Sequence, residues 1–137
     1  MIKNLNPELF DLVIHSIIWA MKHDIPEISE TGLNTLKELI QLINNDTPEF
    51  RNKFYISYCF TIMEELFYVL LDSAHKYSYH LQSEVLFSIL QTIESGRVTD
   101  CIFDQSKYQL NSNQEFIRVY LVETFSNAFP NNSKSYY

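Results

Sequence analysis

Glycine and proline are scarce in this sequence, which has only 2 glycines and 4 prolines among 137 residues. Together they make up about 4% of the chain, against roughly 12% in average proteins. Because tight turns depend on these residues, an all-β sandwich or barrel and a flexible linker are both excluded. With 46% hydrophobic residues, the chain is long and apolar enough to fold as one compact unit.

Cysteine and positive charge are also in short supply. Cys59 and Cys101 form neither a CxxC pair nor a dense disulfide framework, so a reducing compartment, the cytosol or nucleus, is expected. Ten Lys and Arg residues against 17 Asp and Glu residues give a net charge of -7, which repels phosphate backbones and excludes nucleic acid as a partner. The apolar stretch 9–21 is interrupted by Asp11 and His15, so neither a signal peptide nor a membrane span is predicted.

Apolar residues recur with helical spacing in five segments, which predicts an all-α fold. Pro7 follows Asn6 and Pro48 follows Thr47, and a capping residue before proline is typical of a helix N-terminus. Gly96 has the position of a C-terminal cap. The predicted helices span 7–23, 27–44, 48–72, 79–95 and 113–129, with a loop at 97–112 and a disordered tail at 131–137.

The spacing of these helices favours stacked hairpins over a closed bundle. The two helices that begin with proline start at residues 7 and 48, a separation inside the roughly 40 to 47 residues typical of HEAT repeats. Two helix pairs and an unpaired fifth helix therefore predict an α-α superhelix, a solenoid segment of about two and a half helical hairpins.

Three stretches of the chain resemble the late, C-terminal HEAT repeats of the exportin-1 family of karyopherins. They are LVIHSIIWAMKHDIPEISETGLNTLKELIQ at 12–41, FYISYCFTIMEELFYVLLDSAH at 54–75 and NQEFIRVYLVETFSNAFP at 113–130. The resemblance extends over about residues 9–130 and is weakest in the loop from Val98 to Ser112.

This resemblance implies a structural and binding segment of a nuclear export receptor. Such receptors carry cargo with leucine-rich export signals in complex with GTP-bound Ran and shuttle through the nuclear pore between nucleus and cytoplasm. The family's export-signal groove lies in earlier repeats, so this segment is expected to be scaffold without that groove. In the family, the first, third and fifth helices would lie on the outer surface, and the second and fourth would line the interior.

Polar residues on the second and fourth helices are the candidate protein-binding surface. The family orientation would place both stripes on the concave face, whereas the residues alone also fit an ordinary solvated surface. A stand-alone helical adaptor that binds a peptide or helix in an inter-helix groove is the alternative function. A coding sequence that continues for hundreds of residues on both sides would exclude that adaptor. The candidate residues are Glu30, Asn34, Lys37, Gln41, Glu84, Ser88, Gln91 and Glu94.

No catalytic, cofactor-binding or metal site is predicted, and an enzyme is not expected. The four histidines, at positions 15, 23, 75 and 80, include no HExxH spacing, so structural or surface roles are expected for them. Glu64 and Glu65 are adjacent, cannot form a facing carboxylate pair on a helix and are expected to be solvated.

Three further residues or groups have a predicted structural role. A lone Trp in an apolar helix, Trp19, is expected in the core, with a binding anchor as the alternative. Gly32, inside the second helix, is expected to permit close packing of neighbouring helices. Apolar residues of the first helix, and Phe125 and Phe129 at the end of the fifth, predict either self-association through exposed end helices or a fifth helix that folds back along the third or fourth.

Overall fold

The computed structural model describes residues 6–98 and 118–123, and every regular element among them is helical. The prediction of an all-α fold is therefore confirmed. The elements are α1 (Pro7–Met21), α2 (Pro26–Asn44), α3 (Pro48–Leu70), the short 3-10 helix η2 (Ser73–Ser78), α4 (Tyr79–Glu94) and a further helical segment at 118–123.

Two of the helices, α1 and α3, begin where a capping side chain accepts a hydrogen bond from an amide of the first turn, whereas α2 and α4 have no side-chain cap. The Asn6 side chain accepts a hydrogen bond from the Leu9 amide at 2.7 Å, and Thr47 accepts one from the Phe50 amide at 3.3 Å. The first four helices end within two residues of the predicted positions. The sequence did not predict η2, which starts where the Asp72 side chain accepts a hydrogen bond from the Ala74 amide at 3.0 Å.

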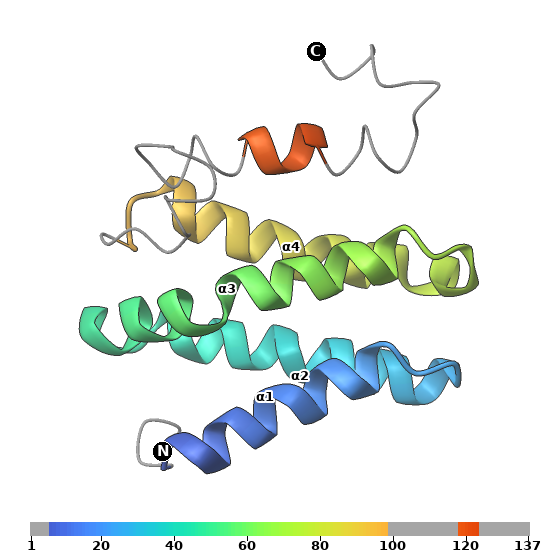
Figure 1. Ribbon diagram of the computed structural model, residues 1–137, viewed down its shortest axis with the longest axis horizontal. Helices are drawn as coiled ribbons and strands as arrows, with labels where there is room; N and C mark the ends of the chain where they lie inside the picture. The colour runs from blue at the N-terminus through green and yellow to red at the C-terminus, as the bar shows by residue number, and fades with distance from the viewer. Residues whose placement is uncertain (1–5, 99–117, 124–137) are drawn as a thin grey trace.

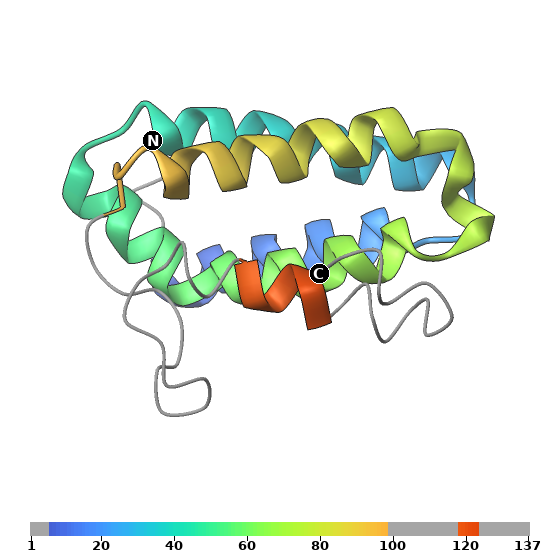
Figure 2. The same ribbon diagram turned by 90° about the horizontal axis from the view of Figure 1, so that it is seen from above.

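The helices form two layers of stacked hairpins. Figure 1 shows the α1–α2 and α3–α4 hairpins one above the other, and Figure 2 shows α2 and α4 in one layer with α1, α3 and 118–123 in the other. The segment 118–123 packs on α3 through Tyr120, whose ring lies 5.6 Å from that of Phe60 and 5.7 Å from that of Phe67. This arrangement confirms the helical-hairpin architecture expected of a HEAT-like segment.

The core lies between the two layers and continues through both hairpins. Its largest fully buried side chains include Ile14, Met21, Leu33, Leu36, Ile40, Ile43, Tyr55, Ile62, Met63, Leu66 and Ile89. Gly32 brings α2 against the end of α1: a Cβ at this position would lie 2.6 Å from the Met21 amide nitrogen and 2.9 Å from the Ala20 Cβ. The predicted role of Gly32 in close packing is thus confirmed.

Two predicted environments are wrong. Trp19 is 64% exposed and lies outside the core, because α1 buries the side that carries Ile14, Ile17 and Ile18, and the next residue is turned about 100° away. Glu65 is half-buried and paired with Lys22, whose Nζ lies 2.7 Å from its Oε2. The predicted stack of hairpins puts the first and third helices in one layer, but the spacing does not indicate which of their side chains meet, so this pair was missed.

Several predictions fall outside the described residues. These are Cys101, the loop from residue 99, the ends of the fifth helix with Phe125 and Phe129, and the tail. Within 6–98 and 118–123, no single helix has both the length and the apolar character needed to cross a membrane. α3 and the segment Ser73–Glu94 are bent by 106° relative to each other, and they have the length and apolar composition of a membrane span only when taken together.

Candidate protein-binding face

The structure places the predicted polar stripes of α2 and α4 in the same layer. One ion pair joins them directly: Lys37 Nζ on α2 lies 2.6 Å from Glu84 Oε2 on α4. His80 extends the cluster, with its Nε2 2.8 Å from the other oxygen of Glu84. The hydrogen bond from Lys37 is the main cause that lowers the pKa of the Glu84 carboxyl from its ordinary value, with the nearby positive charges acting in the same direction.

The other candidate residues surround this ion pair. Four are exposed on their helices, as is Glu94 at the end of α4, whereas Ser88 is half-buried between α2 and α4. We call the set the α2–α4 face, and its members are Glu30, Asn34, Lys37, Gln41, Glu84, Ser88, Gln91 and Glu94. Lys37 and Glu84 hold each other, so the exposed acids Glu30 and Glu94 are the charges that the face presents to a partner.

A hollow of about 200 Å³ lies at the end of this face, where α2 and α4 terminate. Asn44 has a fixed orientation there, because its Oδ1 accepts a hydrogen bond at 2.8 Å from the hydroxyl of the buried Tyr55. The hollow is therefore a polar site, with amide and hydroxyl groups for a partner's polar side chains. It is lined by Asn44, Ser88, Gln91, Thr92, Ser95 and Arg97.

The sequence reasoning missed one aromatic residue on the α2–α4 face. Phe87 is 64% exposed, three residues after Glu84 and four before Gln91, so these side chains share one side of α4. An exposed aromatic ring among polar groups is the composition of an interface anchor. The signal was present in the sequence, because Phe87 lies outside the apolar period of α4.

The opposite layer exposes apolar side chains as well. Trp19 stands beside His23, with ring centroids 5.0 Å apart, and Tyr68 on α3 is 62% exposed. Lys22 lies between the two helices, with its Nζ 4.6 Å from the Tyr68 ring centroid. This contact and the ion pair with Glu65 fix Lys22 between α1 and α3.

The described residues contain no constellation of reactive side chains. Cys59 is buried in the core, and burial raises the pKa of its thiol, so the reactive thiolate is disfavoured. Among these residues, no three His, Cys, Asp or Glu side chains are grouped as metal ligands would be. His15 pairs with Asp11 at 3.4 Å and His80 with Glu84, whereas His75 is buried between the hairpins.

Comparison with known proteins assigns the whole chain to one family. Residues 1–136 match the family described as CRM1 C terminal. The chain is 38% identical over 128 residues to Exportin-1 of Schizosaccharomyces pombe and 37% over 131 residues to Exportin-1 of Dictyostelium discoideum, and 40% over 133 residues to Protein EXPORTIN 1A of Arabidopsis thaliana. These alignments cover 93%, 96% and 96% of this chain but only 12% of each relative.

Proposed function

The chain belongs to the CRM1 C-terminal family, and we propose that it is a segment of a nuclear export receptor whose α2–α4 face contacts a protein partner inside the receptor. GTP-bound Ran is the first candidate for that partner, and export cargo bound with it is the second. The complete receptor shuttles between nucleus and cytoplasm, and this segment contributes scaffold and contact surface without any enzymatic step.

The Lys37–Glu84 bridge is the observation that carries this proposal. It joins two helices from different hairpins, whose polar residues lie in one layer. Exposed Glu30 and Glu94 make the surface acidic, which attracts basic patches on a partner and raises the rate of association. Phe87 supplies an apolar contact in the same area.

A pull-down with GTP-loaded Ran tests the proposal. The complete receptor that contains this segment is compared as wild type, with Glu30→Lys and with Phe87→Ala. We expect each substitution to weaken Ran retention by about threefold to tenfold, since one rim charge or one aromatic contact contributes about that much. The 137-residue chain is assayed beside the receptor to measure how much of the binding it retains alone.

Glu64→Lys is the matched control, because Glu64 is also exposed but lies on α3 in the opposite layer. It makes the same change of charge and is expected to leave Ran retention unchanged. Equal losses from Glu30→Lys and Glu64→Lys would point to a general effect of net charge and contradict a role for this face. Unchanged binding in both α2–α4 face variants would contradict it as well.

A further inference from the structure

Trp19 is an exposed aromatic residue that the proposed binding face does not use. Its side chain is 64% exposed on α1, in the layer opposite to the α2–α4 face. A hollow of about 350 Å³ lies beside it, at the end of α1. This volume is at the lower end of the range for binding pockets and suits one side chain of a partner. We call it the Trp19 hollow, and it is lined by His15, Ile18, Trp19, Lys22, His23 and Asp24.

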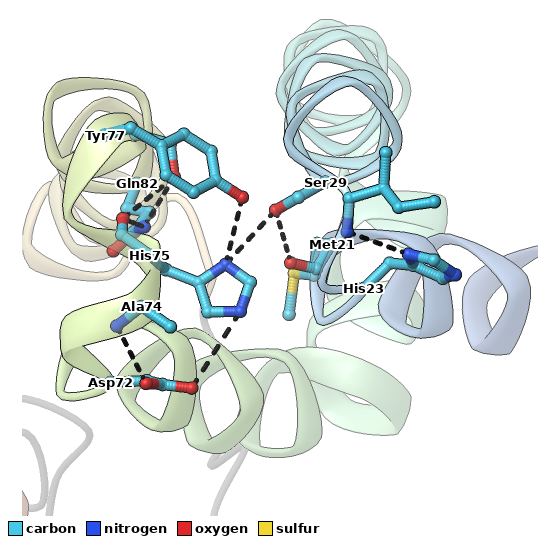
Figure 3. Close-up of polar contacts among 10 residues, drawn as sticks. Met21, His23, Ser29, Asp72, Ala74, His75, Tyr77 and Gln82 are labelled. Atoms are coloured by element: carbon cyan, nitrogen blue, oxygen red, sulfur yellow. Dashed lines mark hydrogen bonds and ion pairs between the residues drawn. The ribbon is translucent and has the colours of Figure 1, made fainter.

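The neighbours of Trp19 hold its ring in place. The ring centroid lies 5.0 Å from that of His23 in an edge-to-face contact. His23 is itself fixed, because its Nδ1 accepts a hydrogen bond from the Ile25 amide at 3.1 Å, which Figure 3 shows. Ile18, which is buried, supplies an apolar part of the lining. A ring that is positioned before binding loses little conformational entropy when a partner stacks on it.

Asp24 is the charged residue of the hollow that lacks a counterion. The charge of Lys22 is balanced, because its Nζ lies 2.7 Å from Glu65 Oε2. His15 is directed to its own helix, where its Nδ1 donates to the Asp11 carbonyl oxygen at 2.9 Å. Asp24 is exposed, and within the described part of the chain its carboxylate has neither a hydrogen bond nor an ion pair. The hollow therefore combines an uncompensated negative charge with an aromatic ring.

This combination matches the side chain of arginine. A guanidinium is planar and positive, so it can stack on the face of an indole ring and still donate from its edge to a carboxylate. We propose that the Trp19 hollow binds an arginine side chain of a protein partner, with Trp19 as the stacking surface and Asp24 as the counterion. The net charge of -7 favours the approach of a basic segment. The site lies in the opposite layer and does not rest on the proposed role of the α2–α4 face.

Other side chains would use only part of the Trp19 hollow. A lysine ammonium can pair with Asp24 but has no planar group that stacks on the Trp19 ring. An aromatic or aliphatic side chain can contact the ring, but it would cover the Asp24 carboxylate without pairing it, which costs desolvation free energy. Both are therefore expected to bind more weakly than arginine.

Fluorescence of the 137-residue chain tests the proposal, because Trp19 is its only tryptophan. The probes are glycine-serine peptides with acetylated and amidated ends, which are identical except that they carry arginine, lysine or phenylalanine. We expect the arginine peptide to change the Trp19 emission saturably and to bind at least about threefold more tightly than the other peptides. The indole N–H resonance of Trp19 should shift with the same dissociation constant.

Two substitutions separate the roles of the ring and the charge. Asp24→Asn keeps the size of the side chain but removes its charge, and should weaken binding of the arginine peptide by about threefold. Trp19→Leu removes the ring and should weaken binding by about fivefold, which calorimetry measures without the fluorophore. Glu27→Gln is the matched control, since Glu27 is also exposed but lies in the first turn of α2, outside the lining of the hollow. It should leave the affinity unchanged.

Equal losses from Asp24→Asn and Glu27→Gln would overturn the proposal, because the peptide would then respond only to net charge. A lysine or phenylalanine peptide that binds as tightly as the arginine peptide would also contradict it, since the hollow would then not select a planar cation. The same holds if the arginine peptide gives no saturable change. Trp19 and Asp24 are both exposed, so circular dichroism should show the wild-type helix content in every variant.

Discussion

The two ends of the hairpin stack are held together in different ways. At the turn end, where α1 meets α2 and η2 joins α3 to α4, the contacts are close and buried: Gly32 touches the backbone of α1, and His75 is packed against Ser29. At the opposite end, the Arg51 side chain joins the α2–α3 connection to the residues after α4. The contact between the hairpins thus depends on close steric packing at one end and on a fixed positive charge at the other.

Arg51 gathers carbonyl groups that the ends of α2 and α4 leave without helical partners. Its Nη1 donates to the Asn44 and Asp46 carbonyls at 3.1 and 3.2 Å, and its Nε to the Arg97 carbonyl at 3.4 Å. A guanidinium keeps its charge throughout the physiological range, so the contribution of Arg51 to stability should not change with pH within that range. Conditions that loosen one end therefore need not affect the other.

The largest expected effect comes from filling the close contact at the turn end. Gly32→Ala would place a methyl group 2.6 Å from the Met21 backbone nitrogen, so the two helices must separate, and we expect a loss of about 3 kcal/mol in the free energy of unfolding. Urea denaturation followed by circular dichroism measures this loss.

Gly96→Ala is the matched control at the opposite end. Among the described residues other than its chain neighbours, no atom lies within 4 Å of the added methyl group, but the positive φ of 79° disfavours any L side chain, which costs about 1 kcal/mol. Equal losses from the two substitutions would contradict the distinction between a contact limited by space and a turn limited by backbone conformation.

Arg51→Met should have the next largest effect, about 2 kcal/mol, because it leaves three carbonyl groups without this donor. Arg51→Lys retains the charge but not the planar fork, so it should recover less than half of the loss. Unfolding curves at about pH 5 and about pH 8 should give the same loss for each variant. A loss that changes with pH would contradict the role of a fixed positive charge at this end.

The sequence predicted the parts of the fold that depend on local chemistry. Caps at Asn6 and Thr47 act within three residues of their partners, and helical periodicity identifies the buried side of α2. The same periodicity predicted the polar stripes, and the structure joins two of their members, Lys37 and Glu84, across 47 positions of the sequence. Their role in binding a partner stays a prediction.

The remaining features depend on which helices become neighbours. His75 meets Ser29 across 46 positions, and no local pattern encodes such a pairing. The prediction that Trp19 lies in the core was wrong because it also depended on the neighbours of α1. This helix has more apolar side chains than the side that faces its neighbours can bury. Phe87 was overlooked because helical periodicity assigns a role only to residues of the repeating pattern. Phe87 is exposed and lies outside the apolar pattern of α4.

Tyr55→Phe tests the hydrogen bond from the Tyr55 hydroxyl to Asn44, which lies at the same end as Arg51. It should lower the free energy of unfolding by about 1 kcal/mol at neutral pH, since the Asn44 side chain loses its donor. Burial raises the pKa of Tyr55 from 10.0 to about 12. The folded state therefore keeps this proton where the unfolded chain releases it, and wild-type stability falls as the pH rises from 10 toward 12. The variant should lose less stability over that interval, and an equal loss would contradict the assignment to Tyr55.

The smallest effect is expected midway between the two ends, at the Lys37–Glu84 pair on the partly exposed surface of the α2–α4 layer. Lys37→Gln should lower the unfolding midpoint slightly in dilute buffer and not at all in molar salt, because salt screens exposed charges. The lowered pKa of Glu84 means that the pair stabilises the fold above the ordinary carboxyl value of 4.5 and ceases to do so as the pH falls through its lowered value. A penalty for Lys37→Gln that persists in molar salt would mean that this pair, and not only the two ends, holds the hairpins in register.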